Sequence, residues 1–197
     1  MLQLIYILLR HVRILQHRGD GRIVNIRILT VHRLRRKLHA SIDTDSLSVM
    51  DWKITTASAY DENMAFGMID SVRDFRCILM DAAYDSSDIY DYIFENTHSI
   101  PVIDTNRRRG IIENKLSYNR KLGIVLGKKE SSRYKLRWEI ERTFSILKKI
   151  LGMEYIWYIK HRNYDVSIGE IIVSYNCIVM ANKIAGISGR KIMYIVS

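Results

Sequence analysis

Cysteine and proline are scarce in this sequence, which has two cysteines and one proline among 197 residues. Cys77 and Cys177 lie in separate apolar runs, and there is neither a CxxC pair nor a Cys/His cluster at metal-ligand spacing. This pattern excludes a disulfide framework and a zinc-finger type of site. We interpret both residues as reduced core cysteines of a cytoplasmic protein.

A long apolar run is also lacking at the start of the chain. The opening stretch "LQLIYILL" is eight residues long and is followed by Arg10 and His11 rather than by a small-residue cleavage site. It is too short to span a bilayer and is unlike a signal peptide. The sequence therefore predicts no membrane partner.

Acidic residues are few, with 21 Asp and Glu against 31 Lys and Arg and a net charge of +10. They are also unevenly placed, since residues 60–104 hold ten acids and two bases, whereas residues 105–150 hold fourteen bases and four acids. A clustered basic block is typical of a surface that binds phosphates, in nucleic acid or at an anionic membrane. On charge alone, a solvated lysine-rich surface is an equal alternative.

Periodicity and breakers predict alternating strands and helices. The expected strands are 37–43, 47–58, 76–84 and 99–104, with "DTDS" as the hairpin turn between the first two. The expected helices are 61–72, 85–96, one from residue 133, and 165–186. We expect residues 106–132, which are polar, basic and Gly-containing, to form a loop. This order predicts one α/β (α+β) domain built on a mixed sheet.

One helical stretch, "YKLRWEIERTFSILKKILG", carries four polar residues at regular spacing. At about 100° per residue, Tyr134, Arg137, Glu141 and Lys148 share a narrow stripe beside the apolar face. We expect Trp138 and Phe144 to pack the helix against the core. Spacing alone favours a simple i,i+4 ion pair between Arg137 and Glu141 over a functional site.

These four residues fit the pattern Y-x2-R-x3-E-x6-K, which resembles the signature around the catalytic Glu of DDE transposases from bacterial and archaeal insertion sequences. The stretch "ILMDAAYDS" is similar to the second-Asp motif of that family, with Asp81 at the matching position. "KLHASIDTD", "KITTASAYDE" and "IPVID" resemble its neighbouring strands and turn. The resemblance covers about residues 36–184 and implies a ribonuclease H-like domain over 36–197, preceded by an unmatched basic segment, 1–35.

The resemblance implies DNA transposition by metal-dependent strand cleavage and transfer. Asp81 and Glu141 would be the catalytic residues and would hold Mg²⁺ or Mn²⁺, because these ions prefer carboxylate oxygens and stabilise the attacking and leaving oxygens of a phosphoryl transfer. Arg137, Arg142 and Lys148 would contact DNA phosphates, and Tyr134 would stack on a base or bond a phosphate. The implied partner is double-stranded DNA, at transposon ends and target, and a homodimer on that DNA is compatible with it.

The sequence departs from this family at the first Asp, which should lie on a strand upstream of residue 37. Asp20 lies in a Gly-flanked turn, and Asp43 is at the end of the expected strand 37–43, which corresponds to the second strand of the family, so both are weak candidates. We expect this carboxylate to be missing. Three hypotheses follow: a defective or active transposase catalytic domain, a catalytically silent DNA-binding remnant of one, and, as a weaker alternative, a ribonuclease H-like nuclease with another role.

Overall fold

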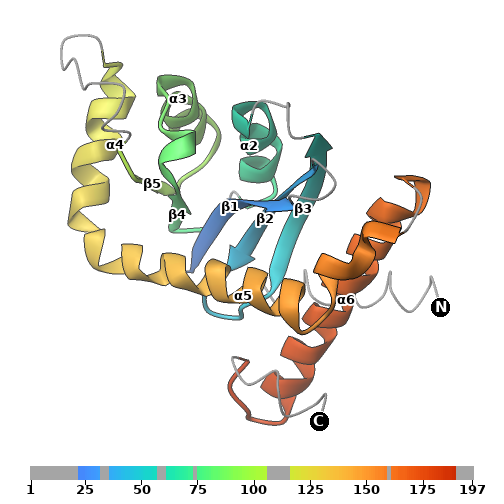
Figure 1. Cartoon of the computed structure of the whole chain (residues 1–197). Coiled ribbons are helices and arrows are strands. Elements are labelled where there is room, and N and C mark those ends of the chain that lie inside the picture. The colour runs from blue at the N-terminus through green and yellow to red at the C-terminus, as the bar shows by residue number, and fades with distance from the viewer. Residues whose placement is uncertain are drawn as a thin grey trace.

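In the computed structural model, five strands form one mixed sheet in the order β3-β2-β1-β4-β5 (Figure 1). The central strand β1 is antiparallel to β2 and parallel to β4, and β4 is parallel to β5. The strands are β1 (Ile23–Val31), β2 (Arg36–Asp43), β3 (Val49–Thr56), β4 (Cys77–Met80) and β5 (Ile100–Ile103). The structure describes residues 22–31, 36–56, 61–72, 75–105, 116–158 and 161–189.

Helices cover both faces of this sheet. The α-helices are α2 (Asp61–Asp70), α3 (Ser87–Asn96), α4 (Tyr118–Lys129), α5 (Arg137–Lys149) and α6 (His161–Ile184). Three short 3-10 helices, η2 (Ala82–Tyr84), η5 (Ser131–Leu136) and η6 (Met153–Tyr158), join the larger elements. α2 and α3 lie on one side of the sheet, and α5 passes across the other (Figure 1). The predicted α+β class with a ribonuclease H-like mixed sheet is confirmed.

The alternation of side chains along the strands divides the core into two faces. Toward α2 and α3, β1 buries Val24 and Ile26 in one apolar cluster with Ile78 and Met80 of β4. Toward α5 and α6, Leu29 of β1 joins the other large cluster, to which these two helices contribute Ile140, Phe144, Leu147, Ile168, Ile172 and Val179. On this second face, β1 also carries Asn25 and Arg27, so two polar residues point toward α5.

Local signals account for most of the predicted elements. The "DTDS" turn forms because the Asp43 carboxylate accepts hydrogen bonds from the Asp45 amide (3.0 Å) and the Ser46 hydroxyl (2.9 Å). Helix α3 begins after Ser86, which caps it because its hydroxyl accepts a hydrogen bond from the Ile89 amide.

The predicted loop at 106–132 is wrong where the structure describes it, because residues 118–129 form α4. Ser117 caps this helix by accepting a bond from the Arg120 amide at 3.2 Å. The two glycines that were interpreted as loop residues serve close packing instead. A Cβ on Gly123 would lie 2.3 Å from the buried Tyr90 ring, and one on Gly127 would lie 3.1 Å from the Pro101 carbonyl oxygen.

The central strand β1 lies inside the first 35 residues, where the sequence analysis assigned no element. Its sequence "IVNIRILTV" alternates, with Val24 and Ile26 on one face of the sheet and Asn25 and Arg27 on the other. Flanking Arg and Gly residues concealed this two-residue period. The first 35 residues thus contain a strand upstream of residue 37, and the residue types along it decide what the site contains.

Candidate functional site

Strands β4 and β5 end level with the middle of the longer parallel strand β1, and the next position on each of the three strands is charged. The register pairs Ile26 with Met80, and Met80 with Ile103. One residue further along each chain come Arg27, Asp81 and Asp104. Met80 is buried on the α2 and α3 side, so Asp81 turns toward α5, the side that Arg27 also faces.

Asp81 is held in place by the short helix that follows it. One carboxylate oxygen, Oδ1, accepts a hydrogen bond from the Ala83 amide at 2.9 Å and so caps η2. The other, Oδ2, lies 3.8 Å from Nε of Arg27. The side chain is about a quarter exposed, at 24%. Asp81 thus combines a structural turn with a carboxylate that faces a cation.

Glu141 reaches the same cation from helix α5. Four side chains anchor this helix on the sheet, namely Ile140, Thr143, Phe144 and Leu147, all of which are buried. The side-chain amide nitrogen Nδ2 of Asn25 also donates to the backbone carbonyl of Arg137 at 3.3 Å. In this position the Glu141 carboxylate pairs with Nη1 of Arg27. The structure therefore brings the two sequence-predicted acids, Asp81 and Glu141, to one guanidinium.

The remaining members of the helical stripe extend this network. Arg137 Nη1 donates to the Tyr134 hydroxyl at 2.7 Å, and that hydroxyl donates to Asp104 Oδ2 at 3.1 Å. Arg137 also lies over the Tyr134 ring and 4.0 Å from Glu141. Burial raises the pKa of Tyr134, although the nearby Arg137 guanidinium lowers it, so the tyrosine is a neutral donor here. The side chains of Tyr134 and Arg137 therefore both contact other residues of this chain. Such contacts agree with the simple ion-pair alternative, which the spacing alone favoured.

Arg142 and Lys148 point outward from the same helix. The Arg142 side chain is 54% exposed and lies 4.0 Å from Glu139. Lys148 is half-buried two turns beyond Glu141, about 10 Å along the helix axis. Phe144 is buried as predicted, but the prediction for Trp138 is wrong, because it is 66% exposed beside Arg137. Its position on the outer side of α5 leaves no core surface for it to cover.

The two weak candidates for the first carboxylate do not join this site. Asp20 lies outside the described residues. Asp43 is buried in the β2–β3 turn and pairs in register with Val24, three residues before Arg27. That offset is about 10 Å along the strand, so Asp43 lies away from the edge that Asp81 occupies. Its nearest cation is Arg22, at 4.0 Å.

The divalent ion implied by the sequence resemblance does not fit these residues. Magnesium and manganese need several oxygen ligands around one point. Here the space between the two acids holds the Arg27 guanidinium, a permanent cation. Within the described ranges, no group of three or more His, Cys, Asp or Glu could hold a metal ion.

Sequence reasoning missed Arg27, the residue around which the site is organised. The signal that locates it is the alternation of "IVNIRILTV", which places Arg27 on the same face as Asn25 and one step past the buried Ile26. That reading requires β1 to be recognised first as a strand parallel to β4.

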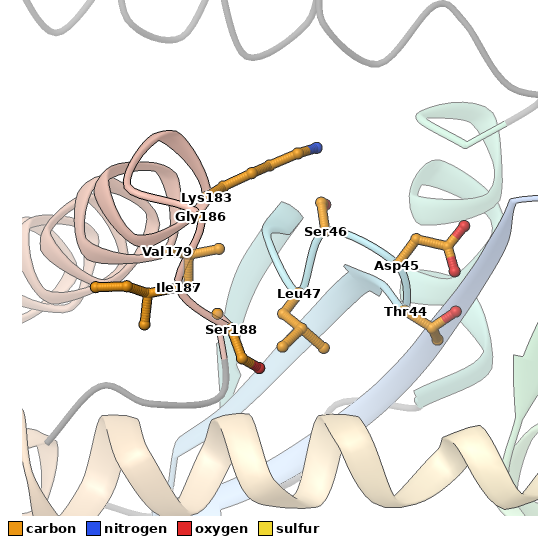
Figure 2. Close-up of a pocket in the computed structure, with 10 residues that line it drawn as sticks. Thr44, Asp45, Ser46, Leu47, Val179, Lys183, Gly186, Ile187 and Ser188 are labelled. Carbon is orange, nitrogen blue, oxygen red and sulfur yellow. The ribbon is translucent and has the colours of Figure 1, made fainter.

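A separate hollow of about 590 Å³ lies between the β2–β3 turn and the end of α6 (Figure 2). It is lined by Asp45, Ser46 and Leu47 on one side and by Val179 and Lys183 on the other. The neighbouring Thr44 bonds the Ile23 carbonyl, at the opposite end of β1 from Arg27. The hollow is therefore distinct from the Arg27 site.

Helix α6 contains a stretch, Tyr164–Ile184, that is long and apolar enough to cross a membrane by length and composition. Such a helix is weak evidence of a span, because core helices of soluble proteins have the same composition. Its buried residues Ile168, Ile172, Tyr175 and Val179 pack in the core against the sheet and α5. Core packing accounts for this apolar stripe.

Comparison with known proteins gives one family. A family model described as a transposase DDE domain matches residues 32–177, which run from just before β2 into α6. No curated protein matches the chain. Proteins of this family generally use divalent metal ions and act on DNA.

Proposed function

The chain belongs to the family of transposase DDE domains, and we propose that it binds double-stranded DNA in transposition without cutting it. The single observation that carries this choice is the Arg27 guanidinium between Asp81 and Glu141. The family match supports the DNA substrate. The arrangement at residue 27 supports binding over cleavage.

The DNA-binding surface that we propose is the basic arm, residues 118–149, which comprises α4, η5 and α5. It carries ten Lys and Arg against three Glu, a net charge of +7. Five of its lysines are exposed, at positions 121, 128, 129, 135 and 149. Lysine and arginine contacts to phosphates give affinity that is independent of sequence and sensitive to salt.

The arm lies next to the Arg27 site, because α5 supplies both Glu141 and the cations beyond it. Arg142 follows Glu141 directly, and Lys148 lies two turns further along the same stripe. A DNA backbone that follows α5 would thus pass the carboxyl edge of the sheet. In this account Arg137 and Tyr134 position Glu141, and Arg142 and Lys148 contact phosphates.

Metal-dependent strand cleavage and transfer is the second candidate function. The observation in its favour is that Asp81 and Glu141 reach one point from β4 and α5. Against it, the residue between them is a cation and not a third carboxylate. The two functions differ in one observable, which is whether supercoiled plasmid DNA is nicked in the presence of Mg²⁺ or Mn²⁺.

Binding is tested by fluorescence anisotropy with a labelled DNA duplex at several salt concentrations. We expect log K to fall linearly with log salt, and Arg142→Ala and Lys148→Ala each to reduce the magnitude of that slope by about 1. The matched control is Lys183→Ala, an exposed lysine on α6 beside the hollow. Salt-independent binding, or a slope that changes as much in the control as in the arm variants, would contradict the proposed surface.

A further inference from the structure

The position of Arg27 in the sheet singles out this residue as the one that decides whether a metal can bind. The β1–β4 register places Arg27, in the middle of β1, beside Asp81 at the end of β4, on the face that α5 covers. A carboxylate at residue 27 would therefore lie on the same side of the sheet edge as Asp81 and Glu141.

The charges at this edge already balance. Arg27 pairs with Glu141 and faces Asp81, and Arg137 lies 4.0 Å from Glu141. Two permanent cations thus accompany two carboxylates. The side chains of the two carboxylates and of the arginine between them are partly buried, with exposures of 23% for Arg27, 24% for Asp81 and 30% for Glu141. Their interactions are therefore screened by solvent less than those of surface pairs.

A divalent ion placed between the same carboxylates would be repelled by the adjacent guanidinium. An arginine side chain in a protein carries a permanent positive charge, so it cannot make room for the ion by becoming neutral. The side chain also bonds Glu141 directly, so an incoming ion would have to displace it.

We propose that Arg27 serves as a built-in cation in place of a divalent metal, and that Arg27→Asp converts this edge into a metal-binding site. The substitution removes the competing positive charge and adds a third carboxylate beside Asp81 and Glu141. Three carboxylates from different elements supply the oxygen ligands that Mn²⁺ and Mg²⁺ prefer. The inference rests on the proposed function only because both concern the same site. Its test uses no DNA.

The test measures Mn²⁺ binding to the full chain, which is monitored by the loss of the free-ion signal in electron paramagnetic resonance. We expect no site-specific binding by the native chain and one Mn²⁺ per chain for Arg27→Asp. We expect Arg27→Asn, which matches the shape of Asp without its charge, to bind at least about tenfold more weakly than Arg27→Asp. Combining Arg27→Asp with Glu141→Gln should weaken binding again.

The same measurement has results that overturn the inference. Mn²⁺ binding by the native chain that Glu141→Gln abolishes would show that Arg27 does not exclude the metal. Folded Arg27→Asp that binds no more Mn²⁺ than Arg27→Asn would show that residue 27 is not a ligand position. If Arg27→Asp does not fold, Arg27→Asn decides, since removal of the cation must by itself raise Mn²⁺ affinity above that of the native chain.

Discussion

At the scale of single residues, the same carboxylates serve in a polar network rather than as isolated groups. Asp81 caps η2 while facing Arg27, and Glu141 pairs with Arg27 and lies near Arg137. Tyr134 then links Arg137 to Asp104. This chain of contacts joins the middle of β1 and the ends of β4 and β5 to η5 and α5.

The buried hydroxyl of Tyr175 on α6 makes the stability of the fold depend on pH in the alkaline range. Its hydroxyl donates to the Leu47 carbonyl at 2.9 Å and lies 3.0 Å from the Thr143 hydroxyl. Burial raises the pKa of Tyr175 to about 12, against 10 in a solvated tyrosine. The unfolded chain therefore loses this proton first as the pH rises.

We predict that Tyr175 contributes stability that is complete below pH 10 and is lost between pH 10 and 12. In that window its share of the unfolding free energy should fall by about 1 kcal/mol per pH unit. Urea unfolding at pH 8, 9, 10 and 11 measures this for the native chain and Tyr175→Phe. The variant should lose about 1 kcal/mol at pH 8, because the Leu47 carbonyl loses its donor, and should decline less steeply above pH 10.

The control for this prediction is Tyr118→Phe, at a tyrosine that is 77% exposed. It should follow the native chain at every pH. An identical decline above pH 10 in native chain and Tyr175→Phe would contradict the assigned role.

At the scale of elements, a buried ion pair fixes helix α4 to the turn between η2 and α3. Nε and Nη2 of Arg120 donate to the two carboxylate oxygens of Asp85, at 3.1 and 2.8 Å. The Asp85 side chain is fully buried and that of Arg120 is 18% exposed. A bidentate pair of this kind holds α4 against the η2–α3 turn, where Gly123 permits the close approach to Tyr90.

We predict that Arg120→Met destabilises the fold by about 3 kcal/mol, because it leaves the Asp85 charge buried and unpaired. Chemical denaturation of native chain and variant gives the difference. The matched control is Arg76→Met, since Arg76 pairs with Glu130 at 3.1 Å but is 48% exposed. That surface pair should contribute about 0–1 kcal/mol. Equal losses in the two variants would contradict the clamp.

Elements with a strong local periodicity were predictable from the sequence. Elements that depend on contacts with other elements of the chain were not. β2, α3 and α5 carry clear alternation, a cap or an apolar stripe, and their boundaries fell close to those predicted. α4 was missed because its glycines meet Tyr90 and Pro101, residues from other elements. Similarly, Asp81 and Glu141 were predicted from the resemblance to family motifs, whereas Arg27 follows only from the β1–β4 register.

At the scale of the whole molecule, the uneven charge along the sequence has a structural meaning. The acidic stretch, residues 60–104, supplies three acids that meet the rest of the chain. Asp81 faces Arg27, and Asp85 pairs with Arg120. Asp104 accepts a hydrogen bond from Tyr134, which in turn accepts one from Arg137. Part of the basic excess is thereby neutralised inside the fold. The exposed lysines of the basic arm remain as a field that attracts a polyanion.

The central claim is that this transposase-family chain binds DNA but does not cut it, because a guanidinium stands between Asp81 and Glu141. The most direct measurement is the nicking of supercoiled plasmid with Mg²⁺ or Mn²⁺, under conditions in which the chain is bound to the DNA. We predict that the native chain and Glu141→Gln convert plasmid to the open circular form at the same background rate. Metal-dependent nicking by the native chain that Glu141→Gln abolishes would contradict the account.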